Sequence, residues 1–233
     1  EENGAMATDA LIEDDDNTYY VDSNGVMVTN TWVKVVNEDQ DDEDDPAEYH
    51  YYYMQSNGKA YKDKSTNGSL TKKVIDGKRY AFDEDGKMLY GWVEEGNAER
   101  LDNSDNDAVI KNNPTYYFGG EDDGAMTTGW LLTDVTYNEA TNDDYKYTAA
   151  AFNDDEDQTR WFYFKSNGKK VYSSSTDETK DKTINGKKYA FDEHGAMVAE
   201  WSIDTVWASA NTASRNNAKY SQQWKYFNSV EDG

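Results

Sequence analysis

The stretch "YYYMQSNG" (residues 51–58) sets the pattern of this chain, because a run of large aromatic residues leads directly into a Ser-Asn-Gly turn. Aromatic residues over four consecutive positions predict a half-buried strand, and the glycine that follows predicts a turn with positive φ. Runs with the same spacing are "TYYVDSNG" (18–25), "RYAFDEDG" (79–86), "WFYFKSNG" (161–168) and "KYAFDEHG" (188–195). Two further runs with a longer turn are "TYYFGGEDDG" (115–124) and "WKYFNSVEDG" (224–233). The chain is therefore an array of one small unit.

A second signature follows four of the turns, in which Gly-x-Met is followed a few positions later by a tryptophan. Its copies are Gly25 to Trp32, Gly86 to Trp92, Gly124 to Trp130 and Gly195 to Trp201. We expect the second strand of a hairpin here, as in "VMVTNTWVKV" (26–35) and "AMTTGWLLT" (125–133). Each hairpin of such an array buries its apolar face against its neighbours, and arrays of this kind mostly bind other molecules.

The predicted hairpins are themselves grouped into a longer sequence repeat. Three hairpins form one super-unit, which spans residues 18–92 and recurs at 115–201, with partial repeats at 2–12 and 224–233. The sequence predicts an all-β fold, an elongated solenoid of consecutive β-hairpin repeats with polar loop insertions. We expect residues 1–233 to be a single repeat array and a fragment of a longer one.

The core of this array is expected to be aromatic. Leu, Ile, Val and Phe make up about 14% of the chain, and below roughly 20% a high net charge suggests disorder. The 19 Tyr and 7 Trp recur at fixed places in the repeat and supply large buried surfaces instead. We expect mainly structural roles for the four tryptophans of the Gly-x-Met signature and core positions for its methionines, Met27, Met88, Met126 and Met197.

Charge excludes several classes of partner. The net charge of −24 disfavours nucleic acid and anionic membranes, which both require clustered Lys and Arg. No apolar run is long enough for membrane insertion. The polar segments 37–50, 94–113, 138–159 and 208–222 predict loops at hairpin tips or between units.

The strings "INGKKYAFDEHGAM" (184–197) and "WFYFKSNGKK" (161–170) resemble the cell-wall-binding repeat superfamily. This superfamily includes choline-binding repeats, the glucan-binding repeats of glucosyltransferases and the repetitive oligopeptides of large clostridial toxins. The resemblance covers nearly the whole chain apart from the acidic insertions. It implies a secreted or cell-surface protein of the Gram-positive type.

The resemblance also implies where ligands bind. In choline-binding relatives, the tryptophan after Gly-x-Met meets the first aromatic residues of the next run, and the rings surround a quaternary ammonium. Carried over to this sequence, the candidate sites are Trp32 with Tyr51 and Tyr52, Trp130 with Trp161 and Phe162, and Trp201 with Trp224.

Two departures favour sugars over choline as the ligand. Arg79 and Lys188 stand where the choline-binding pattern has tryptophan, and long insertions separate Trp32 from Tyr51 and Trp130 from Trp161. The expected partner is therefore a polysaccharide or host glycan, with a choline-decorated cell wall as the alternative. A third reading is the structural stalk of an adhesin.

Catalysis finds little support in the sequence. The chain has only His50 and His194, no cysteine, and neither a G-x-S-x-G nor an H-E-x-x-H motif. The acidic run "DNSDNDA" (102–108) has Asp107 where a calcium-binding EF-hand loop needs glycine. We expect a non-catalytic protein with no catalytic residues, no metal and no cofactor.

Overall fold

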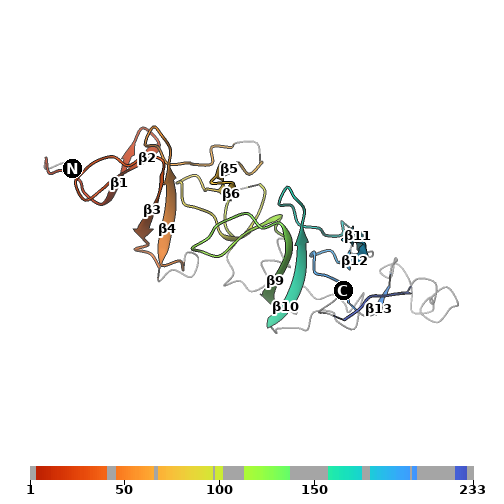
Figure 1. The fold of residues 1–233 in the computed structure, drawn as a ribbon. Coiled ribbons are helices and arrows are strands. Elements are labelled where there is room, and N and C mark those ends of the chain that lie inside the picture. Colours follow the sequence, from red (N-terminus) through yellow and green to blue (C-terminus); the bar gives the residue numbers. More distant parts are fainter. Residues whose placement is uncertain are drawn as a thin grey trace. The chain divides into compact units, whose positions relative to one another are not determined.

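The computed structural model describes residues 4–40, 46–65, 68–96, 98–101, 113–136, 157–174, 179–199, 201–203 and 224–229. In this part of the chain the regular elements are strands paired in seven two-stranded antiparallel sheets (Figure 1). The all-β class and the consecutive hairpins predicted from the sequence are confirmed. None of the described elements is a helix that is long and apolar enough to cross a membrane.

Three short hairpins close with two-residue turns. They pair β1 (Ala10–Asp14) with β2 (Asn17–Val21), β5 (Lys72–Ile75) with β6 (Lys78–Ala81), and β11 (Lys180–Ile184) with β12 (Lys187–Phe191). In the last two, Asp76-Gly77 and Asn185-Gly186 have φ values of 48° and 81°, and of 49° and 82°. Positive φ at both positions matches the right-handed twist of the strands, which is why Asp-Gly and Asn-Gly are favoured there.

Two long hairpins carry the tryptophans Trp32 and Trp130. They pair β3 (Thr31–Val36) with β4 (Tyr49–Met54), and β9 (Gly129–Thr136) with β10 (Asp157–Phe164). Residues 37–48 connect β3 to β4, and residues 137–156, which lie outside the described part of the chain, connect β9 to β10. Two further pairs are β7 (Gly91–Val93) with β8 (Tyr116–Phe118), and β13 (Trp201–Ile203) with β14 (Trp224–Tyr226).

The pairing differs from the sequence interpretation in one respect. The aromatic run was expected to pair with the segment after its own glycine turn, but that contact is limited to an isolated bridge, such as Val21 with Met27. The tryptophan strand instead pairs with the next aromatic run along the chain. Asn30, with φ of 51°, and Gly129, with φ of 82°, turn the chain just before those strands.

The glycine turns share one hydrogen-bond pattern. In the turn at Gly86, the Asp83 side chain accepts hydrogen bonds from the backbone N–H groups of Asp85 and Lys87, at 3.0 and 2.7 Å. Asp22 and Asp192 hold the equivalent turns in the same way. Where Gln or Lys replaces this aspartate, Asn57 and Asn167 each accept one such bond from the residue after the glycine.

Consecutive repeats are tied together by backbone hydrogen bonds. The N–H of Met88 donates to the carbonyl of Tyr51, and the N–H of Met197 donates to that of Trp161, both at 2.8 Å. The same bond joins Ala60 to Thr18, Met126 to Arg79 and Lys170 to Thr115. The first residue of one run therefore binds the residue two positions after the turn glycine of the next run.

The chain divides into two compact units, residues Glu1–Ser104 with Tyr117–Met126, and Asp105–Tyr116 with Thr127–Gly233. Each unit has an aromatic core. Trp92 and Phe118 are almost fully buried in the first, as are Tyr116, Phe162, Phe164 and Phe191 in the second. Met88 and Met197 are buried as expected, but the expectation is wrong for Met27, which is 46% exposed and lies over the turn glycine Gly58.

Candidate functional site

An aromatic cluster in the first unit surrounds the half-buried Trp32 on β3. Its ring contacts Tyr53 and Tyr80 edge-on, with centroids 5.2 and 4.9 Å apart, and Phe82 at 5.9 Å. Tyr61 stacks on Tyr53 at 5.6 Å. Edge-to-face pairs of this kind are worth about 0.5–1.5 kcal/mol beyond the surface they bury, so the rings hold one another in place. We call these five residues the Trp32 cluster.

The second unit repeats this arrangement around Trp130 on β9. Its ring contacts Tyr163 at 5.1 Å, Tyr189 at 4.8 Å and Phe191 at 5.9 Å. Trp161 adds a fourth neighbour, edge-on at 5.9 Å. We call these five residues the Trp130 cluster.

The strand registers decide which sequence-predicted site residues share a face. Trp32 pairs with Tyr53 and Lys34 with Tyr51, and successive residues alternate between faces, so Trp32 and Tyr51 lie on the same face of the hairpin. Tyr52 pairs with Val33 on the opposite face and is 5% exposed. The structure therefore brings Trp32 and Tyr51 together and places Tyr52 in a different core.

The same holds in the second unit. Trp161 pairs with Leu132 and lies on the face of Trp130, whereas Phe162 pairs with Leu131 and is fully buried on the other face. Trp201 lies on β13, paired with Tyr226, and Trp224 lies on β14, paired with Ile203. For Trp201 and Trp224 the structure describes the backbone alone. The acidic run at 102–108 lies outside the described residues.

The aromatic surfaces beside the two tryptophans differ in their neighbouring side chains. In the first unit, the Nζ atom of Lys34 lies 3.6 Å from the centroid of the Tyr49 ring and 5.4 Å from that of Tyr51. It is also 3.8 Å from Asp122, which accepts a hydrogen bond from the Tyr51 hydroxyl. An internal ammonium thus occupies the aromatic surface beside Trp32, and its contact with Tyr51 raises the pKa of Lys34.

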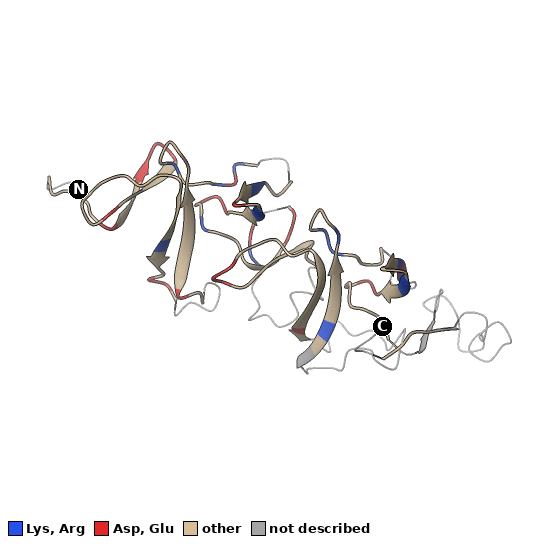
Figure 2. Ribbon diagram, in the orientation of Figure 1, with Lys and Arg blue, Asp and Glu red and all other residues tan. Residues whose placement is uncertain are grey.

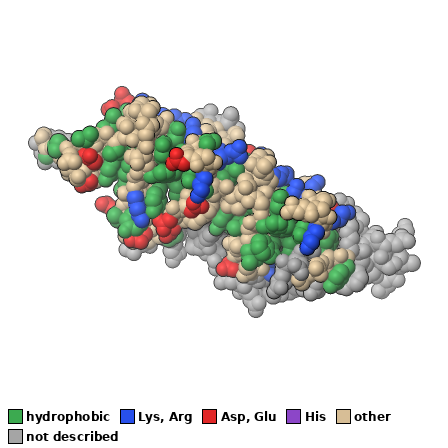
Figure 3. Space-filling model, in the orientation of Figure 1, with side chains coloured by type: hydrophobic (Ala, Val, Ile, Leu, Met, Phe, Trp, Pro, Cys, Tyr) green, Lys and Arg blue, Asp and Glu red, His purple; other side chains and the backbone are tan. Residues whose placement is uncertain are grey.

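Among the described residues of the second unit, the strand position of Lys34 holds no cation. Leu132 takes the position of Lys34 in the strand register and is 48% exposed beside Trp161. Thr159 replaces Tyr49, and its hydroxyl donates to Asp134 at 2.7 Å. On the face drawn in Figure 3, hydrophobic side chains gather over β9 and β10. We call Trp130, Trp161, Leu132, Asp134 and Thr159 the β9–β10 platform.

Buried charges lie next to the glycine turns of both units. Burial raises the pKa of the Asp83 carboxyl to about 6. In the second unit, burial raises the pKa of Asp192 and lowers that of Lys170, whose charges attract each other. Within the described part of the chain, no group of three or more His, Cys, Asp or Glu side chains could hold a metal ion. The Asp83 and Asp192 carboxylates accept hydrogen bonds from the backbone N–H groups of their turns.

The sequence interpretation did not include Tyr53, Tyr80 or Phe82, or their counterparts Tyr163, Tyr189 and Phe191, in the candidate sites. The usable signal is strand alternation combined with register, because the aromatic residue two positions after Tyr51 or Trp161 must share its face. Lys34 could not be anticipated in this way, since its contact with Tyr49 depends on the pairing of β3 with β4.

The fold and these clusters define a class of protein, a chain of β-hairpin repeats whose aromatic rings gather where successive repeats meet. Residues 10–27 and 157–170 match the model of a family described as a putative cell wall binding repeat. The resemblance expected from the sequence is confirmed by this match, which takes in β1, β2 and all of β10 with the turn that follows it. No curated protein sequence matches the chain.

Three similar solved structures come from bacteria. Choline binding protein F of Streptococcus pneumoniae, determined with a tetrasaccharide-pentapeptide peptidoglycan analogue, is 23% identical, with a TM-score of 0.46, over 87% of this chain and 48% of its own. The modular autolysin LytC of the same organism is 18% identical, with a TM-score of 0.38, over 86% and 36%. A truncated alternansucrase of Leuconostoc mesenteroides is 15% identical, with a TM-score of 0.38, over 70% and 10%. The chain spans less than half of each.

Proposed function

We propose that this chain is a non-catalytic cell-wall-binding module of a secreted or surface protein, and that it binds a polysaccharide or host glycan by stacking sugar rings on aromatic side chains. The match to a cell wall binding repeat supports the class. The observation that carries the ligand is the β9–β10 platform, where Trp161 and the exposed Leu132 lie beside the Asp134 carboxylate and the Thr159 hydroxyl.

This combination suits a sugar. The apolar face of a pyranose ring stacks on an indole, while the Asp134 carboxylate and the Thr159 hydroxyl oxygen accept hydrogen bonds from the sugar hydroxyls. A single shallow site of this kind is weak. A polymer repeats the same sugar many times and so offers the site a high local concentration, which makes it a better ligand than a monosaccharide.

Choline on the cell wall is the second candidate, favoured by the rings of the Trp130 cluster. The Lys182 ammonium lies 5.5 Å from the Tyr163 centroid, so this cluster accepts a cation on at least one face. In the first unit Lys34 occupies the rings of Tyr49 and Tyr51, at the positions of Thr159 and Trp161 in the second unit. Choline binding therefore centres on the second unit in this alternative.

A glycan screen with a choline titration tests the proposal. The chain is applied to soluble glucans, dextran and mucin glycans, with Trp161→Ala as the site variant and Tyr51→Ala as the control at the equivalent position of the first unit. We expect glycan binding that Trp161→Ala abolishes and Tyr51→Ala preserves. Binding of millimolar choline without binding of any glycan would favour the choline alternative. Binding of neither ligand would favour a structural stalk.

A further inference from the structure

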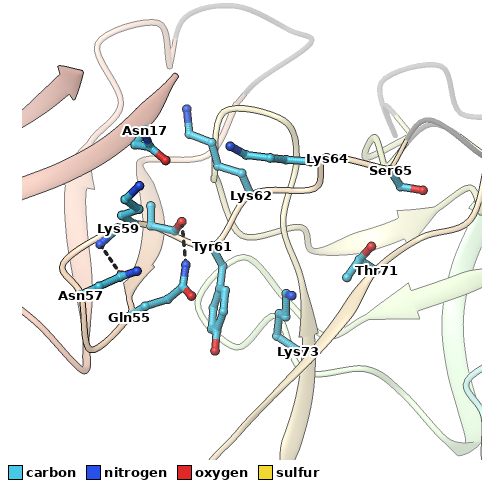
Figure 4. Close-up of a pocket in the computed structure, with 11 residues that line it drawn as sticks. Asn17, Gln55, Asn57, Lys59, Tyr61, Lys62, Lys64, Ser65, Thr71 and Lys73 are labelled. Carbon is cyan, nitrogen blue, oxygen red and sulfur yellow. Dashed lines mark hydrogen bonds between the residues drawn. The ribbon is translucent and has the colours of Figure 1, made fainter. Parts of the chain in front are cut away.

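A cavity that is separate from the β9–β10 platform opens in the first unit. It has a volume of about 530 Å³ and lies beside the loop from β4 to β5 (Figure 4). Its described lining residues are polar or cationic apart from Ala60 and Tyr61. Its lysines are Lys59, Lys62, Lys64 and Lys73.

The charge of this cavity is opposite to that of the molecule. The chain carries a net charge of −24, yet four lysines and no acidic residue are among the described residues that line the cavity. Figure 2 shows Lys and Arg in β5, in β6 and in the loop before β5. Lysines that repel one another around one space cost stability unless an anion comes to occupy it.

The lysines are held in place by the surrounding structure. The Lys62 side chain is only 9% exposed, its stem lies over the turn glycine Gly86, and its ammonium is 3.7 Å from Glu13. Glu13 is 67% exposed and can turn to solvent when another anion arrives. Lys73 lies 5.1 Å from the centroid of the Tyr61 ring. Figure 4 shows Lys64 extending toward Lys62.

The buried Asp63 fixes the loop that carries Lys62 and Lys64. Its carboxylate accepts hydrogen bonds from the backbone N–H groups of Ser65 and Thr71, at 2.7 and 3.0 Å, and from the Thr71 hydroxyl at 3.3 Å. The nearest acidic side chain in the sequence is therefore engaged with the backbone of the loop. It organises the cavity without neutralising its lining.

The second unit does not repeat these residues. When the two "SNGK" turns are aligned, Val171, Tyr172 and Ser174 stand at the positions of Tyr61, Lys62 and Lys64. The repeat scaffold thus folds without the lysines. Their presence in the first unit is a local feature that hairpin formation does not require.

We propose that this cavity binds a sugar that carries an anionic group, a phosphate, sulfate or carboxylate, with the anion among Lys62, Lys64 and Lys59 and the sugar toward Tyr61 and Asn57. Ammonium groups form charge-assisted hydrogen bonds with such oxyanions. The cavity is large enough for a monosaccharide or disaccharide. Its residues differ from those of the β9–β10 platform, so this proposal does not depend on the function proposed above.

The net negative charge limits the kind of ligand and does not prevent binding. At physiological salt, charges farther away than about 8 Å are largely screened, so the local lysines dominate at the cavity. A densely charged polymer would meet the acidic surfaces of the rest of the chain. A sugar with a single or sparse anionic group avoids this repulsion.

An NMR titration of the full chain, following backbone amide signals, tests the proposal. The probes are glucose 6-phosphate, glucose 6-sulfate and glucuronate, with neutral glucose and inorganic phosphate as references. We expect at least one charged sugar to shift the amides of Asn57, Lys59 and Lys62. We also expect its dissociation constant to rise about tenfold in the Lys62→Gln/Lys64→Gln variant, because two charge-assisted contacts are lost.

The matched control is Lys165→Gln/Lys169→Gln. It removes the two lysines that flank the Ser-Asn-Gly turn of the second unit and should leave the titration unchanged. Circular dichroism verifies that both variants fold. The proposal is overturned if glucose binds as tightly as its phosphate, if the Lys62/Lys64 variant binds like the native chain, or if single-stranded DNA binds more tightly than the sugars. Equal affinity for inorganic phosphate overturns the sugar part.

The Trp161→Ala variant separates this inference from the proposed function. It should lose neutral glycan binding and keep the response to the charged sugar. If neutral glycans bind the native chain but the charged sugar does not, only the cavity proposal is wrong.

Discussion

At the scale of single residues, Lys34 is the main difference between the two aromatic clusters. Its ammonium covers Tyr49 and Tyr51 in the first unit, while the exposed Leu132 stands at this position in the second. A ligand that stacks on Trp161 in the second unit would have to displace an internal cation to stack on Tyr51 in the first. One side chain thus makes two otherwise similar surfaces unequal.

Replacing this lysine should open a second site. In Lys34→Leu the Tyr51 ring loses its cation, and the cost to stability is small because the ion pair with Asp122 is exposed and worth about 0–1 kcal/mol. We expect isothermal titration calorimetry with the glycan found in the screen to show a rise in stoichiometry from one to two sites per chain. An unchanged stoichiometry would indicate that Lys34 does not block this surface. Leu132→Lys is the reciprocal variant and should remove binding.

The Asp83 carboxyl gives the fold a pH dependence of defined sign. Its pKa is raised to about 6 in the folded state by burial, against 3.8 as its ordinary value. Between these two values the folded chain holds a proton that the unfolded chain has released, so the contribution of Asp83 to the free energy of unfolding falls as the pH rises from about 4 to 6.

Asp83→Asn should remove this contribution while keeping an acceptor for the N–H groups of Asp85 and Lys87. We expect urea denaturation at pH 7 to show the variant equal to or more stable than the native chain, with the difference vanishing near pH 4. Glu84→Gln removes one charge from the same turn at an exposed side chain and serves as the control. If both variants give the same pH profile, burial of Asp83 is not the cause.

At the scale of elements, turn glycines and the side chains above them set the spacing of repeats. Gly58 has a φ of +81°, and the Met27 side chain lies where a β-carbon would be. Met6 lies over Gly25 and Met88 over Gly124 in the same way. The order of Gly, Met and aromatic residues recurs along the sequence for a physical reason, because the methionine of one repeat contacts the turn of a later one.

Gly58→Ala should destabilise the first unit through two effects. The left-handed backbone costs a residue with a β-carbon about 1–2 kcal/mol, and the displaced Met27 adds to this. Gly77→Ala is the matched control, because Gly77 has the same φ of +81° and open space around its β-carbon position. Thermal unfolding should show a larger loss for Gly58→Ala. Equal losses would mean that the methionine contact contributes nothing.

Strand positions and glycine turns could be predicted from the sequence, because both follow from local patterns such as "YYYMQSNG" and "WFYFKSNG". The pairing of β3 with β4 could not, since the partners are separated by an acidic segment and local patterns do not encode which strands meet. The Asp76-Gly77 and Asn185-Gly186 turns do carry a strong local signal for two-residue hairpins, and the interpretation of the sequence overlooked it.

The candidate site was predicted in part for the same reason. The aromatic nature of the site is a matter of composition and spacing, so Trp32, Tyr51, Trp130 and Trp161 could be singled out. Which rings share a face depends on register, and this separates Tyr52 and Phe162 from the tryptophans. The lysine cavity combines the loop residues 55–65 with Asn17, Thr71 and Lys73, and the sequence does not show that these three segments meet.

At the scale of the whole molecule, the two units share one plan and differ in their surfaces. The first has an occupied aromatic surface and a lysine-lined cavity, and the second has an open aromatic platform. We infer that the repeated scaffold supplies stability while positions that the scaffold does not constrain differentiate the units. A chain built in this way can bind different groups of one polymer with different units.

The most direct test of this account is an NMR titration that follows the indole N–H signals of the seven tryptophans with the glycan selected by the screen. The account predicts that the signals of Trp130 and Trp161 shift with a common dissociation constant, while that of Trp92, which is 2% exposed, stays in place. Saturable glycan binding that leaves both Trp130 and Trp161 unshifted would contradict it.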